Sequence, residues 1–95
     1  MEIIFEILYQ EEVVKKDIPA FSPEIKKIIK SAIEKKLQTK PHIYGKPLRN
    51  SLFGFRSLRI GDYRVIFQII LPQKVVITVI QHRSRAYEIA SKRST

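Results

Sequence analysis

Hydrophobic and polar residues alternate in the opening stretch of the chain. In the opening sequence MEIIFEILYQ, every second residue from position 3 to position 9 is apolar or aromatic, whereas Glu6 lies on the opposite parity. A period of two is typical of a strand that buries one face. Turn residues at Gly61-Asp62 and Pro72-Gln73 separate three further predicted strands in an antiparallel meander. They cover residues 53–60, 62–71 and 74–81. The last of them contains KVVITVI, which is apolar on both faces and suits the centre of the sheet.

A helical period separates the first strand from the other three. In the segment FSPEIKKIIKSAIEKKL, Ser22 is the expected N-cap, Pro23 takes the first helical position and Glu24 lies at the positive end of the helix dipole. The apolar residues that follow recur at helical spacing and predict a stripe that faces a core. They are Ile25, Ile28, Ile29, Ala32, Ile33 and Leu37.

These elements belong to one predicted domain that covers residues 1–95. Two shorter helices are predicted, at residues 11–18 and at residues 84–92 with Ser84 as the cap, and residues 38–51 form a loop. The predicted fold class is α+β: an N-terminal strand, two helices packed on one face of an antiparallel sheet, a three-strand meander and a short C-terminal helix. The other face of the sheet is expected to stay free for a ligand.

The distribution of charge along the chain indicates what kind of partner to expect. The net charge is +9, but residues 1–34 hold five lysines and seven acidic residues. Residues 35–95 hold thirteen lysines or arginines, and their only acidic residues are Asp62 and Glu88. A basic region of this density attracts polyanions. Nucleic acid is therefore the first partner to expect.

Several classes of protein are excluded by composition. The chain has no cysteine, so it holds neither a disulfide framework nor a thiolate metal site, and two histidines are too few for a typical zinc cluster. We expect no metal and no other cofactor. The apolar runs are as short as strands, and the first residues lack the pattern of a secretory signal. We therefore expect a cytoplasmic protein without a membrane partner.

Arginines inside the strands are the candidate site. Arg59 and Arg64 lie in neighbouring strands, and Arg83 and Tyr87 follow the last strand. Antiparallel pairing brings these positions together on one face, where guanidinium groups donate to phosphate and an aromatic ring stacks on a base. An arginine midway along an apolar strand costs desolvation unless it has a partner, so Arg64 and Arg83 are the strongest candidates.

Two motifs carry a family resemblance. The sequences LRIGDYRVIFQI and VVITVIQHRSRAY, preceded by GKPLRNSLFGFRSLR, resemble the RelE/ParE superfamily of toxins from type II toxin–antitoxin modules. The HRSRAY ending is closer to the RelE branch. That branch comprises mRNA endonucleases that act in the A site of the 30S ribosome, where the ribose 2′-OH attacks the adjacent phosphate without a metal.

The resemblance implies a role for each matching residue. Arg64 and Arg83 would stabilise charge on the reacting phosphate, and Tyr87 would stack on the displaced base or exchange a proton. Further basic residues would bind mRNA or ribosomal RNA: Lys46, Arg49, Arg56, Arg59 and Arg85. The resemblance also implies a cognate antitoxin, which we expect to be acidic because the carboxyl half of the chain is so basic.

One position departs from the family pattern. Many RelE relatives carry Lys or Arg directly before LR, whereas this chain has Ser57. Arg56, Arg59 or His82 would then supply the missing group, since histidine is the residue type suited to proton exchange near neutral pH. Packing at a strand end also explains His82. Three functions stay open: a ribosome-dependent endonuclease, a DNA gyrase inhibitor of the ParE kind, and a catalytically weakened relative that only binds its antitoxin.

Overall fold

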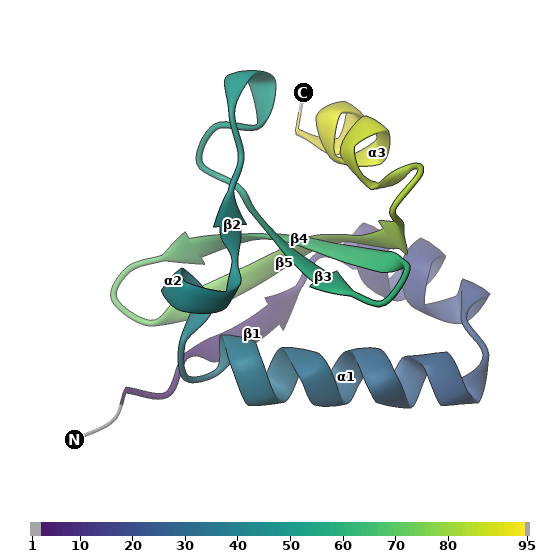
Figure 1. Ribbon diagram of the computed structural model, residues 1–95, viewed down its shortest axis with the longest axis horizontal. Coiled ribbons are helices and arrows are strands. Elements are labelled where there is room, and N and C mark those ends of the chain that lie inside the picture. Colours follow the sequence, from purple (N-terminus) through teal and green to yellow (C-terminus); the bar gives the residue numbers. More distant parts are fainter. Residues whose placement is uncertain (1–2, 95) are drawn as a thin grey trace.

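The computed structural model describes residues 3–94 and contains a five-stranded sheet in the order β1-β5-β4-β3-β2 (Figure 1). The long helix lies on one side of this sheet and the last helix on the other. The strands are β1 (Glu6–Tyr9), β2 (Lys46–Pro47), β3 (Arg56–Ile60), β4 (Tyr63–Ile70) and β5 (Lys74–His82). The predicted α+β class is confirmed.

The meander β3-β4-β5 is confirmed, but the sheet as a whole is mixed. β3 pairs antiparallel with β4 and β4 with β5, whereas β1 pairs parallel with β5, with Glu6 opposite Lys74. Alternation of apolar residues is the same for both directions of pairing, so it predicts a strand without its orientation. The expectation of a purely antiparallel sheet was wrong for this reason.

The first face of the sheet carries the main core. Single helical turns η1 (Val13–Asp17) and η2 (Ile18–Ala20) lead into α1 (Pro23–Leu37). The Ser22 hydroxyl accepts a hydrogen bond from the Ile25 amide at 3.3 Å, as expected of an N-cap. The stripe on α1 is narrower than predicted, because Ile28 is exposed. The buried residues of this core are Phe5, Val13, Ile29, Ile33, Leu37, Leu58, Val65, Phe67, Val75, Ile77 and Ile80.

The predicted loop at residues 38–51 contains three short elements instead. These are α2 (Pro41–Tyr44), β2, and η3 (Asn50–Leu52), which is a turn of 3₁₀-helix. Gly45 lets this segment approach the core, because a Cβ there would lie 2.2 Å from Cζ of Phe67. The Gly45 carbonyl also accepts a hydrogen bond from Nη1 of Arg56 at 2.8 Å. The segment is therefore fixed to the sheet rather than extended into solvent.

The second face of the sheet is partly covered, contrary to the expectation that it is free. α3 (Ala86–Arg93) packs on it, and Ala86 and Ala90 let the helix come close to the strands. The second core consists of Leu52, Ile66, Val79, Ala86 and Ala90. The predicted cap was also wrong: Arg85 is the N-cap of α3, and the Ser84 hydroxyl instead lies 2.9 Å from Nδ1 of His82.

Candidate active site

The strand register brings Arg59 and Arg64 directly opposite each other. Arg59 on β3 pairs with Arg64 on β4, and Arg64 pairs with Gln81 on β5. The side chains of directly paired residues share a face, which here is the one that carries α3. Tyr87 in the first turn of α3 lies over this row, with its ring centroid 5.6 Å from Cζ of Arg64. The predicted grouping of Arg59, Arg64 and Tyr87 is therefore present.

Arg83 and Arg85 extend the same end of the sheet. The Arg83 amide donates to the Asp62 carbonyl at 2.7 Å, which continues the ladder between β4 and β5 beyond His82. Arg83 lies in the turn that directly follows β5 and leads to α3. Arg85 precedes α3, and both arginines are exposed. We call Arg59, Arg64, Arg83 and Arg85 the arginine cluster, because all four lie at the end of the sheet where β3, β4 and β5 meet the start of α3.

The arginine cluster is not paired with carboxylates within residues 3–94. None of its members makes an ion pair there, and Nε of Arg59 donates only to the Gly61 carbonyl at 3.3 Å. Like charges directly opposite each other on neighbouring strands destabilise a sheet. A bound polyanion would remove that repulsion, and guanidinium groups are suited to phosphate oxygens.

This repulsion predicts the effect of Arg59→Gln on stability. At low ionic strength we expect the free energy of unfolding to rise by about 0.2–1 kcal/mol, since one of two opposed charges is removed. In about 1 M salt the gain should vanish, because the Debye length falls to about 3 Å. Urea unfolding at both salt concentrations measures the effect. Arg85→Gln, off the sheet, is the matched control, and a loss of stability at low salt would contradict the prediction.

Two predicted site residues lie on the first face instead. His82 pairs with Tyr63, whose ring packs against the main core, and the two ring centroids are 6.0 Å apart. Arg56 pairs with Phe67, and its Nη1 donates to the carbonyls of His42 and Gly45. The structure does not bring either residue to the arginine cluster. Of the three substitutes considered for a cation at Ser57, only Arg59 shares the face of Arg64.

Ser57 itself is buried. It is 4% exposed and pairs with Ile66, a member of the second core. Lys46 on β2 is its other neighbour and is exposed on the same face. Arg49 lies directly before η3 and is also exposed. Lys46 and Arg49 therefore form a basic flank on β2 and the following turn.

Asp17 and Arg93 are the functional candidates that sequence reasoning missed. The fully buried Asp17 carboxylate makes two 2.8 Å hydrogen bonds to the Arg93 guanidinium at the end of α3. This hydrogen bonding is the largest cause that raises the pKa of Arg93. The residues are 76 positions apart, so no local spacing could pair them. The available signal in the sequence was a single acidic residue directly before Ile18-Pro19, and it is a weak indication of a buried ion pair.

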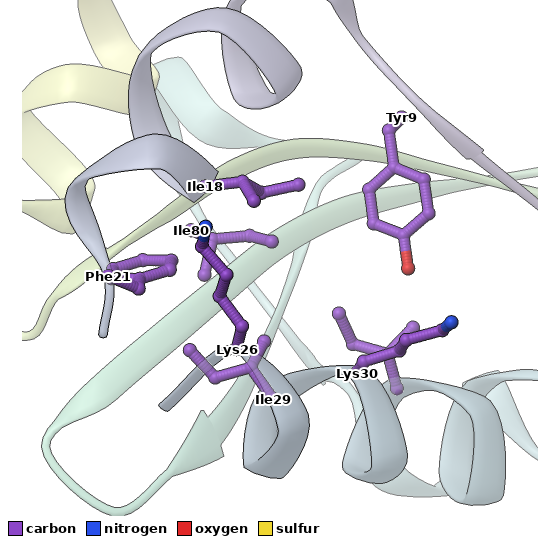
Figure 2. Close-up of a pocket in the computed structure, with 8 residues that line it drawn as sticks. Tyr9, Ile18, Phe21, Lys26, Ile29, Lys30 and Ile80 are labelled. Carbon is purple, nitrogen blue, oxygen red and sulfur yellow. The ribbon is translucent and has the colours of Figure 1, made fainter. Parts of the chain in front are cut away.

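An apolar pocket of about 300 Å³ lies on the first face, away from the arginine cluster (Figure 2). Tyr9 points into it, and Lys26 and Lys30 extend along it from α1. Burial, and secondarily the charge of Glu34, raise the pKa of Tyr9. The remaining lining residues are Ile18, Phe21, Ile29, Ile33 and Ile80. The pocket contains none of the predicted site residues.

Residues 3–94 contain neither a cluster of possible metal ligands nor a helix that could cross a membrane. Their histidine, aspartate and glutamate side chains nowhere gather in groups of three that could hold a metal ion. Their helices are too short or too polar to cross a membrane.

Comparison with known proteins places this architecture in a class. The model of the family described as ParE toxin of type II toxin–antitoxin system, parDE, matches residues 3–87. The chain therefore belongs to the RelE/ParE superfamily and is the toxin component of a type II toxin–antitoxin system. The resemblance predicted from the two motifs is confirmed.

Two relatives from Mycobacterium tuberculosis carry the RelE name. The chain is 46% identical to Toxin RelE over 54 residues, a stretch that spans about half of each protein. It is also similar to a chain in the crystal structure of the toxin–antitoxin complex RelBE2, with a TM-score of 0.79 and 28% identity. That match covers 86% of this chain and 94% of the other.

Proposed function

We propose that this toxin is an mRNA endonuclease of the RelE kind, which acts on message in the A site of the ribosome. The observation that carries the proposal is the contact of Arg64 with the exposed Tyr87 ring at the edge of α3, with Arg59 opposite Arg64 and neither arginine in an ion pair among residues 3–94. The identity to Toxin RelE supports the same branch. The proposed cell compartment is the cytoplasm, where ribosomes and message are found.

The proposed reaction needs no metal and no cofactor. The ribose 2′-OH attacks the adjacent phosphorus, and the bond from phosphorus to the 5′ oxygen of the next nucleotide breaks. The products are a 2′,3′-cyclic phosphate and a free 5′-OH; one proton leaves the attacking oxygen and one reaches the leaving oxygen. Arg64 and Arg83 stabilise the charge that develops on the phosphate. Tyr87, 39% exposed, stacks on the base or exchanges a proton.

The proposed protein partner is an acidic cognate antitoxin. RelBE2 of Mycobacterium tuberculosis is a toxin–antitoxin complex, and the net charge of +9 on this chain is complementary to an acidic segment. Contact with the ribosome draws on the arginine cluster together with Lys46, Arg49 and Arg56. Co-expression with the antitoxin should rescue growth, whereas a chain that is harmless at high expression would contradict the toxin activity.

The match to the ParE family model favours inhibition of DNA gyrase as the second candidate. One pair of assays separates the two. In a translation extract, primer extension should map cuts within codons of ribosome-bound message, and a 2′-O-methyl group at the cut site should prevent them. A supercoiling assay with gyrase should show no inhibition. Inhibited supercoiling without message cleavage would replace the proposal with the ParE activity. Inactivity in both assays would leave antitoxin binding as the only function still open.

The role of Tyr87 is tested with two substitutions. Tyr87→Phe keeps the ring and removes the hydroxyl, so a large loss of cleavage assigns proton exchange to the hydroxyl. A small loss for Tyr87→Phe with a severe loss for Tyr87→Ala assigns the ring to base positioning; stacking contributes about 1–3 kcal/mol per base. Single-turnover cleavage of ribosome-bound message measures both. Full activity of Tyr87→Ala would show that Tyr87 has no role in cleavage.

Salt dependence tests whether phosphate contacts dominate binding. We expect ribosome affinity to fall by about 0.7–0.9 log units per log unit of salt for each neutralised phosphate. Arg59→Ala should reduce this slope, since Arg59 lies in the cluster. Arg56→Ala should reduce it less, because Nη1 of Arg56 is already bonded to two backbone carbonyls. An affinity independent of salt would contradict the proposed basic surface.

A further inference from the structure

The carboxylate of Asp17 joins three elements of the fold. It lies in η1, is fully buried and accepts hydrogen bonds from β5 and from α3. On β5, the donors are the Ile80 amide at 2.9 Å and the Gln81 side-chain amide at 2.7 Å. On α3, both terminal nitrogens of Arg93 donate at 2.8 Å. Every bond of this carboxylate therefore leads to an element that borders the arginine cluster.

The Arg93 end of this network fixes α3. Arg93 is only 8% exposed, and its Nη1 also donates to the Thr78 carbonyl at 3.0 Å. Its Nε lies 3.3 Å from a carboxylate oxygen of Glu12. Tyr87 stands six positions earlier on the same helix, about 9 Å along its axis. The last turn of α3 is thus held, and the helix transmits that placement to the Tyr87 ring.

The Gln81 end of the network fixes the strand position beside Arg64. Gln81 is the direct partner of Arg64 on the neighbouring strand, and its amide is bonded to the same carboxylate that holds Arg93. Both members of the Arg64–Tyr87 pair are consequently tied to Asp17, one through β5 and the other through α3. The pair itself is a single cation–π contact with an exposed ring, which is too weak to orient a helix alone.

A buried ion pair has little advantage in stability over apolar residues of the same shape, but it can select one geometry among several. We propose that Asp17 is the positioning residue of this site: through Gln81 and Arg93 it sets the distance and angle between the Arg64 guanidinium and the Tyr87 ring. The proposal rests on the proposed function, because that geometry matters where a phosphate and a base are held together.

The test compares the double variant Asp17→Asn/Arg93→Met with the native chain. The asparagine oxygen keeps the hydrogen bond from the Ile80 amide, and methionine leaves no unpaired charge in the interior. NMR ring-current shifts of the Arg64 side-chain protons report the contact with Tyr87 in the free protein. We expect these shifts to collapse and single-turnover cleavage to fall by about 10- to 100-fold, since small displacements of reacting groups have effects of that size. Ribosome affinity should change little.

Two further variants make the outcome decisive. Arg93→Lys keeps the charge without the forked geometry and should give an intermediate loss of both signals. Glu11→Gln removes an exposed carboxylate just before η1, where Glu11 pairs with Lys15, and should change neither signal. Retention of the ring-current shifts in a folded double variant would overturn the positioning role. A native chain that cuts no message would overturn the proposed function instead, and the NMR comparison would still decide the role of Asp17.

Discussion

Replacing Asp17 alone with asparagine should destabilise the fold by about 3–5 kcal/mol, because it leaves a buried arginine without its carboxylate. The Arg93 side chain is 8% exposed, and its remaining partners are the Thr78 carbonyl and the half-exposed carboxylate of Glu12. A domain of this size has a free energy of unfolding of about 5–15 kcal/mol, so the loss is a large part of the total. Urea unfolding of the purified variant measures it.

Two comparisons control this result. Glu11→Gln removes an exposed ion pair from the neighbouring segment and should cost at most about 1 kcal/mol. The double variant Asp17→Asn/Arg93→Met should recover much of the loss, since it no longer buries an unpaired charge. A single variant that unfolds at the native urea concentration would show that Asp17 and Arg93 are not paired as described.

Removing Arg64 or Arg83 should reduce the rate of message cleavage by about 10²- to 10³-fold each, which corresponds to about 2.7–4 kcal/mol in the chemical step. The reason is that both residues are proposed to stabilise the negative charge that develops on the phosphate. Arg64→Ala also removes the cation–π contact to Tyr87, so part of its effect comes from the ring. Single-turnover cleavage of ribosome-bound message isolates the chemical step.

Ribosome affinity separates chemistry from docking in these variants. It should fall much less than the rate, because docking draws on the whole basic surface. Arg49→Ala is the matched control: it removes the same charge from an exposed position before η3 and should change affinity without changing the chemical step. If Arg64→Ala and Arg83→Ala both retained full cleavage activity, the residue roles implied by the family would not apply to this chain.

Local patterns of the sequence were sufficient to predict the β3-β4-β5 meander and α1. Turn residues at Gly61-Asp62 and Pro72-Gln73 fix the hairpins, and these in turn place Arg59 opposite Arg64. The same alternation places His82 on the face of Tyr63 and not on the face of Arg64. Parity along β5 was therefore the available signal for setting His82 apart.

Features that depend on contacts between distant residues could not be predicted. α3 covers part of the second face because Ala86 and Ala90 fit against Ile66 and Val79, and the short helix alone carries no sign of its docking side. The bulge in the β4–β5 pairing leaves Thr78 without an opposing residue on β4. It also shifts the pairing of the later residues of β5 by one position. The Asp17–Arg93 pair is the clearest example, since it joins η1 to the end of α3, 76 positions later in the sequence.

The parallel pairing of β1 with β5 has a consequence for the order of synthesis. Its partners, Glu6 and Lys74, lie near opposite ends of the chain, so β1 must wait for nearly the whole domain to leave the ribosome. The β3-β4-β5 hairpins involve neighbouring residues and can form earlier. Arg93 is synthesised later still, and α3 cannot be held beside Arg64 before Arg93 has left the ribosome. A nascent toxin therefore stays unassembled, and we expect it to be inactive, until the segment through Arg93 has left the ribosome.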